Sequence, residues 1–145
     1  MFLGKHVCTL DKENRLSTPS AFKSDLSSGI YVTQGFDRNL LILTTGAFQE
    51  IYQSVRSLNI ADPLARLLLR LVLGTASQSG ADGTGQIIIP GDLKDFAGLH
   101  ETVLAIGQGE YFEVWSPESW NKQEIQLRDA ETNAGRFTML SIGTR

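Results

Sequence analysis

The residues near the start of the chain that could do chemistry lie in one charged loop, LDKENRLSTPSAF at 10–22. Arg15 offers a planar guanidinium that suits phosphate oxygens or the O6 and N7 atoms of guanine, and Lys12 adds a second cation. Asn14 tolerates a positive φ better than most residues, and Asp11 can accept hydrogen bonds from nearby backbone amides. The loop therefore predicts a tight left-handed turn that holds Arg15 at a fixed angle.

Two interpretations of this loop are open. In the first, Arg15 and Lys12 contact a polyanion while Asp11 and Asn14 shape the turn. In the second, Asp11 and Arg15 pair with each other as a clasp within the loop. A carboxylate and a guanidinium four residues apart are compatible with both.

Other reactive residue types stand alone in the sequence. His6 and His100 have no cluster of cysteine, histidine or carboxylate at metal-ligand spacing. Cys8 is the single cysteine and is expected to be a small buried hydrophobe. The GQG at 107–109 lies between two predicted strands, which is typical of a hairpin turn rather than a phosphate loop. We therefore expect no enzyme activity, no metal, no cofactor and no small-molecule ligand.

The charge of the chain is unevenly divided. The net charge is −3 at pH 7, but residues 1–75 carry 8 Lys/Arg against 6 Asp/Glu, whereas residues 76–145 carry 5 against 10. A surface that binds a polyanion is therefore expected in the first half. Because its excess of positive charge is small for a nucleic-acid-binding domain, oligomerisation would have to add avidity.

The composition is that of a globular protein, with 41% hydrophobic and 20% charged residues. The longest apolar run, LLLRLVLG at 67–74, is far shorter than the roughly 18 residues of a membrane span. The N-terminus has no signal-peptide pattern, and one cysteine fits a reducing compartment. We therefore expect a cytoplasmic protein that does not enter a membrane.

The charged loop is the first of two copies. A shift of 71 positions places 10–22 over ADGTGQIIIPGDL at 81–93, and a shift of 72 places 34–48 over 106–120. The second loop keeps the aspartate, since Asp82 corresponds to Asp11. Gly85 stands at the position of Asn14, and Gln86 stands at the position of Arg15. Because glycine occupies the position of Asn14 in the second copy, a positive φ is predicted at this position in both loops.

Each copy reads as a loop, a short strand, a proline-led helix, a β-hairpin and a closing helix. This order predicts a mainly β protein with helices (α+β), divided into a first half at 1–60, a linker helix at 61–75, a second half at 76–121 and a polar C-terminal tail at 122–145. Arg66 and Arg70 lie one turn apart on the linker helix. They are interpreted as a solvated stripe on a buried helix, with a ligand or subunit contact as the alternative.

Five segments in this order carry a resemblance to a known family: MFLG, LDKENRLSTPSAF, DPLARLLLRLVLGTAS, ADGTGQIIIPGDLKDFAGL and FEVWSPESW. Over about residues 1–120 the chain resembles the MraZ family of bacterial transcriptional regulators. The resemblance implies tandem AbrB-like swapped-hairpin β-barrel halves with helices packed outside, and a ring-shaped homo-oligomer. It also implies a nucleoid-associated protein that binds double-stranded DNA at the promoter of the division and cell-wall gene cluster, usually as a repressor.

The loops depart from the family pattern, Asp-x-Lys-Gly-Arg. Glu13 stands where lysine is usual, Asn14 replaces glycine, and Gln86 replaces the second arginine. The resemblance assigns DNA contact to Arg15 and, from the neighbouring position, to Lys12. Gln86 is the weakest candidate because it loses the charge-assisted bond and its counterion release.

A second hypothesis is an AbrB-like interaction module that binds a protein partner without strong DNA binding, as AbrB-like antitoxins bind toxins. Such antitoxins usually join one barrel half to a long partner-binding tail. Here two halves fill the chain and only about 25 residues follow them.

Overall fold

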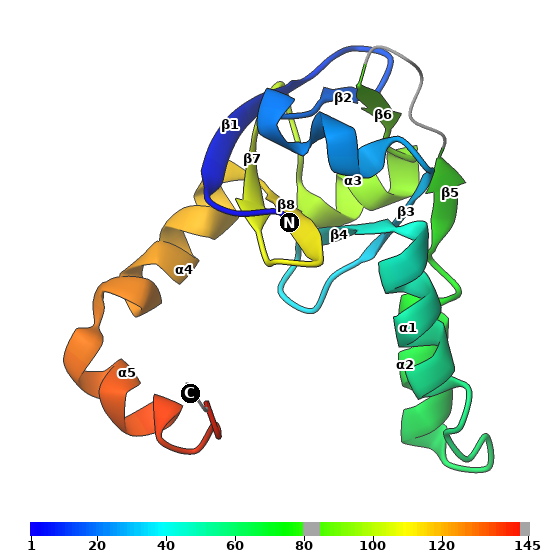
Figure 1. The fold of residues 1–145 in the computed structure, drawn as a ribbon, viewed down its shortest axis with the longest axis vertical. Coiled ribbons are helices and arrows are strands. Elements are labelled where there is room, and N and C mark those ends of the chain that lie inside the picture. Colours follow the sequence, from blue (N-terminus) through cyan, green and yellow to red (C-terminus); the bar gives the residue numbers. More distant parts are fainter. Residues whose placement is uncertain (80–84, 143–145) are drawn as a thin grey trace.

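The computed structural model describes residues 1–79 and 85–142. Across these residues eight antiparallel strands form one sheet that curves into a barrel, with helices outside it (Figure 1). The strands are β1 (Lys5–Leu10), β2 (Arg15–Ser17), β3 (Ile30–Gln34), β4 (Leu40–Thr44), β5 (Ser77–Ser79), β6 (Gln86–Ile88), β7 (Thr102–Gly107) and β8 (Tyr111–Trp115). The helices are the 3₁₀ helix η1 (Ser20–Leu26), α1 (Thr45–Val55), α2 (Pro63–Val72), α3 (Gly91–Ala97), α4 (Pro117–Arg128) and α5 (Ala130–Phe137). The predicted fold class is confirmed.

The two halves exchange their first strands. Along the sheet the order is β5-β3-β4-β8-β7-β1-β2-β6, and the repeat makes β5 the counterpart of β1 and β7 that of β3. β1 pairs with β7 of the second half, while β5 pairs with β3 of the first half. This reciprocal exchange is the swapped-hairpin arrangement, and it makes one sheet of both halves.

One hydrophobic core is shared by the halves. The rings of Phe2, Phe22 and Phe112 lie 5.0 to 5.2 Å apart at its centre, and all three side chains are buried. Phe2 and Phe22 come from the first half and Phe112 from the second. Because burial of such rings supplies much of the folding free energy, the halves stabilise each other.

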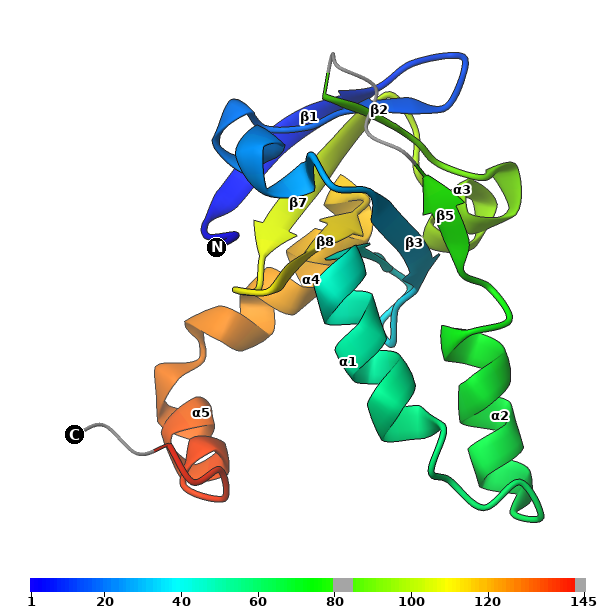
Figure 2. The same ribbon diagram turned by 45° about the vertical axis from the view of Figure 1, so that its right-hand side comes forward.

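The linker helix is less buried than the sequence predicted. α2 begins with the Asp62 side chain accepting a hydrogen bond from the Leu64 amide at 2.9 Å and with proline in its first turn. It projects from the barrel together with α1 (Figures 1 and 2), so Leu64 and Leu67 are 70% and 60% exposed. The prediction of a buried helix was wrong, because only its C-terminal end reaches the sheet, where the Thr33 hydroxyl donates to the Val72 carbonyl at 2.9 Å.

The described part of the segment after the second hairpin contains two helices. Ser116 caps α4, and the ring of Trp115 contacts that of Trp120 edge to face, with their centroids 5.4 Å apart. α4 continues to Arg128, and α5 follows it. Both helices extend away from the barrel on the side opposite α1 and α2 (Figure 1). Across the described residues, every helix is too short or too polar to cross a membrane.

Candidate nucleic-acid interface

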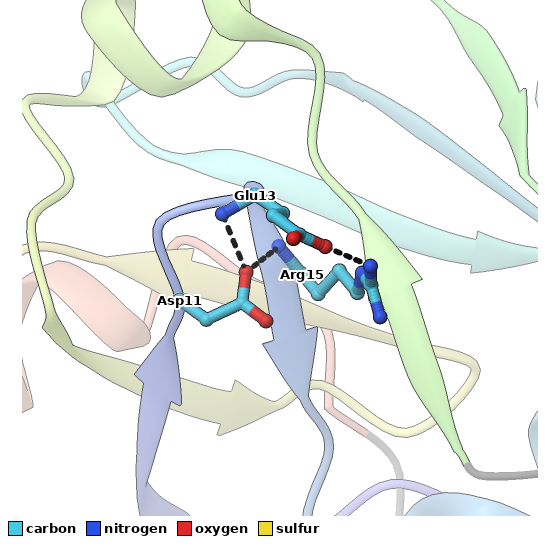
Figure 3. A network of polar contacts seen from close by, with 3 residues as sticks. All are labelled: Asp11, Glu13 and Arg15. Carbon is cyan, nitrogen blue, oxygen red and sulfur yellow. Dashed lines mark hydrogen bonds and ion pairs between the residues drawn. The ribbon is translucent and has the colours of Figure 1, made fainter.

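The loop between β1 and β2 is held by Asp11. Its Oδ1 atom accepts hydrogen bonds from the backbone amides of Glu13 and Arg15, each at 2.9 Å (Figure 3). The Asn14 amide donates to the Asp11 carbonyl at 3.0 Å, and Asn14 has a φ of 62°. The left-handed turn predicted from the sequence is therefore present. The Asp11 side chain stabilises it through hydrogen bonds to the backbone on both sides of Asn14.

The guanidinium of Arg15 pairs with the carboxylate of Glu13 (Figure 3). The predicted alternative, a clasp between Asp11 and Arg15, is replaced by two separate contacts, since Asp11 binds the backbone and Glu13 binds the guanidinium. The side chains of Arg15 and Glu13 are 43% and 67% exposed. An ion pair this exposed is weak, so a stronger anion could displace the Glu13 carboxylate.

The second loop lies at the other end of the ribbon that β2 and β6 form. Asp82 lies outside the described residues, but Gly85 has a φ of 76°, as expected for the counterpart of Asn14. In the antiparallel pairing Arg15 lies opposite Ile88, and Ser17 lies opposite Gln86. Arg15 and Gln86 therefore share one face of the ribbon, because alternate residues of a strand point to the same side.

The two loops make reciprocal backbone contacts. The carbonyl of Asn14 accepts a hydrogen bond from the Ile89 amide at 2.8 Å. The carbonyl of Gly85 accepts from the amide and the hydroxyl of Thr18, at 3.4 and 2.6 Å. The first loop is thus bonded to the residue after β6, and Gly85 of the second loop is bonded to the residue after β2. These bonds fix the distance between Arg15 and Gln86.

Two lysines that the sequence analysis did not select lie against these loops. Lys94 of α3 donates from Nζ to the Asn14 side-chain oxygen at 3.0 Å. Lys23 of η1 covers the other loop, where a Cβ atom on Gly85 would lie 2.8 Å from the Lys23 Cε. The two lysines are 71 positions apart in the sequence. This spacing equals the offset between the two copies of the repeat, so aligning the copies would have identified the two lysines as counterparts.

An open hollow of about 530 Å³ adjoins the first loop. It is lined by Thr9, Leu10, Asp11, Lys12, Lys94, His100 and Glu101. Lys12 and Lys94 come from different halves of the chain. The hollow is therefore lined by two lysines that are far apart in the sequence.

Cys8 does not take part in this site. Its side chain is 5% exposed within β1, and burial raises the pKa of the thiol from 9.0 to about 11. The thiolate, which is the reactive form, is therefore scarce near neutral pH. Cys8 is the small buried hydrophobe that the sequence predicted.

Comparison with known proteins decides the family. The family model described as "MraZ protein, putative antitoxin-like" matches the chain twice, at residues 1–71 and 72–141. The chain belongs to the MraZ family. The two matches meet at the C-terminal end of α2 and are separated by the same offset of 71 residues as the two loops, so the MraZ model contains one copy of the repeat.

Relatives in this family match over most of their length. A protein of Roseiflexus castenholzii is 38% identical over 137 residues, which is 94% of each chain. One of Herpetosiphon aurantiacus is 36% identical, over 83% of this chain and 84% of its own. One of Thermomicrobium roseum is 35% identical, over 97% of this chain and 99% of its own. Each of these relatives bears the name Transcriptional regulator MraZ.

Proposed function

We propose that this protein is a transcriptional regulator that binds double-stranded DNA sequence-specifically through the loop between β1 and β2. The observation that carries the proposal is the position of Arg15. Its backbone is fixed by Asp11, and its side chain stands on the outer face of the β2–β6 ribbon. The names of the MraZ relatives support the assignment to transcription.

In this proposal Arg15 contacts a guanine edge or a phosphate after DNA displaces Glu13. Lys12 binds the DNA backbone. Asp11 and Asn14 hold the first turn, and Asp82 and Gly85 do the same in the second. Gln86 adds a hydrogen bond at most, because it carries no charge.

Self-association would strengthen the weak contacts of each subunit. The isolated chain exposes large apolar side chains on its projecting helices: Leu64, Leu67, Ile125, Leu127 and Phe137. Such side chains are typical of protein interfaces. By the family resemblance, we place this chain in a ring-shaped homo-oligomer in the nucleoid of the cytoplasm, at the promoter of the division and cell-wall gene cluster.

Selection of bound sequences from random duplex DNA by the purified protein tests the proposal. Enrichment of a short repeated motif is expected. On that duplex, Arg15→Ala should weaken binding by about 1–3 kcal/mol, measured by mobility shift. Arg56→Ala removes an equal charge from an exposed site at the end of α1 and should leave binding unchanged. An Arg15→Ala variant that binds as tightly as the parent would rule out this role.

A second candidate is a module that binds a protein partner, and the exposed apolar side chains of α2 and α5 favour it. The dependence of binding on salt separates the two functions. A steep loss of DNA affinity as salt rises is expected for DNA binding, because counterions are released from phosphates. Salt-insensitive binding to a co-purifying protein, with no enriched DNA sequence, would establish the second function instead.

A further inference from the structure

Lys94 differs from Arg15 in the kind of partner that holds it. The ammonium of Lys94 donates to the neutral side-chain amide of Asn14, whereas the guanidinium of Arg15 is paired with the carboxylate of Glu13. A neutral acceptor fixes the direction of an ammonium without cancelling its charge. The charge of Lys94 therefore remains available to an anion that enters the hollow beside the loop.

The side chain of Asn14 is not required by the turn itself. Gly85 adopts the same left-handed conformation in the second loop without a side chain. The amide of Asn14 is thus an addition to the turn, and the contact it makes reaches Lys94, 80 residues away in the sequence. Lys94 and Asn14 are both partly buried, which limits the rotamers that the lysine can adopt.

Acidic as well as basic residues line the hollow. Asp11 already accepts two backbone hydrogen bonds through Oδ1. Glu101 is another of the lining residues, and its backbone carbonyl accepts a hydrogen bond from the Leu10 amide at 2.8 Å. Lys12, Lys94 and His100 supply nitrogen atoms that can donate to an anion.

We propose that this hollow binds a phosphate of the DNA backbone, with Lys94 and Lys12 as its donors and Asn14 as the residue that positions Lys94. The site rests on the proposed function, since it requires DNA at the first loop. It adds a cation that the second half contributes to the loop of the first half. This contribution offsets the charge that Glu13 removes from the same loop.

Four variants test the site with the duplex that selection recovers. Lys94→Gln should weaken binding about tenfold and reduce the slope of log K against log salt by about 0.9 for each subunit engaged. Asn14→Gly keeps the turn but frees Lys94, so it should weaken binding about threefold. Glu101→Gln removes a repelling charge and should tighten binding about threefold. Lys122→Gln, on the exposed surface of α4, should match the parent.

The tightening expected for Glu101→Gln cannot come from misfolding, so it protects the test against a loss of structure. If Arg15→Ala weakens binding while Lys94→Gln and Glu101→Gln behave like the parent, the phosphate site is wrong and the proposed function stands. If Lys94→Gln lowers the slope but Asn14→Gly equals the parent, the positioning role of Asn14 is wrong. If no duplex is enriched by the parent, both the function and the site are wrong.

Discussion

Leu16 and Ile87 face each other across the β2–β6 ribbon, and both side chains are completely buried. They are 71 positions apart, so each is the counterpart of the other in the repeat. The pairing therefore lies on the local two-fold axis that relates the halves. On the outer face of the same ribbon this axis relates Arg15 to Gln86. The backbone of the two halves is therefore symmetric here, but only the first half carries a positive charge at this position.

Leu16→Ala should destabilise the protein by about 2–5 kcal/mol, because it opens a cavity where the halves meet. The free energy of unfolding from urea denaturation measures the effect. Ile88→Ala is the matched control, since Ile88 lies on the outer face of the ribbon and is 60% exposed. It should change stability by no more than about 0.5 kcal/mol. Equal losses in the two variants would contradict a core at this pair.

Glu13→Gln should tighten DNA binding by about 1 kcal/mol or less. The variant frees the Arg15 guanidinium from an exposed ion pair and removes a negative charge from the loop. Fluorescence anisotropy with the selected duplex measures the change. Glu50→Gln makes the same change of charge on exposed α1 and should have no effect. Unchanged or weaker binding by Glu13→Gln would show that Glu13 does not compete with DNA.

The double variant Leu64→Glu and Leu67→Glu should reduce the size of the oligomer. Both leucines are exposed on α2, and charged residues are unfavourable in the centre of an interface. Size-exclusion chromatography with light scattering reports the mass. The control adds two carboxylates to exposed positions of α1, through Gln49→Glu and Gln53→Glu. If the leucine variant keeps the mass of the parent, the α2 surface is not a subunit interface.

Cys8 should resist alkylation by iodoacetamide at about pH 8 in the folded protein and react after unfolding in urea. Its pKa is raised by burial from 9.0 to about 11, so folding favours the neutral thiol. The stability that this preference contributes is present below pH 9 and is lost as the pH rises toward 11. Mass spectrometry measures the labelling, and Cys8→Ala is the blank because the chain has one cysteine. Rapid labelling of the folded protein would contradict the burial of Cys8.

Local features were predictable from the sequence because their causes are local. The positive φ of Asn14 and Gly85 followed from residue type and from the alignment of the two loops. By contrast, either Asp11 or Glu13 could have paired with the Arg15 side chain, so the choice of Glu13 as its partner required coordinates.

The errors concern relations between distant segments. The leucines of α2 have the spacing that is typical of a buried helix, but a helix that exposes an apolar surface has the same spacing. Lys94 was overlooked because its contact with Asn14 joins residues 80 positions apart in the sequence. Periodicity describes one segment at a time and carries no information on such contacts.

The exchange of strands also governs how the chain folds as it leaves the ribosome. β1 can pair with β2 as soon as residues 15–17 are made, but Lys5 in β1 pairs with Ile106 in β7, so the opposite edge of β1 has no partner until nearly three quarters of the chain has been made. Contacts this distant in sequence slow folding and leave edges open to aggregation. The emerging first half must therefore wait, with one edge of β1 open, until translation delivers β7.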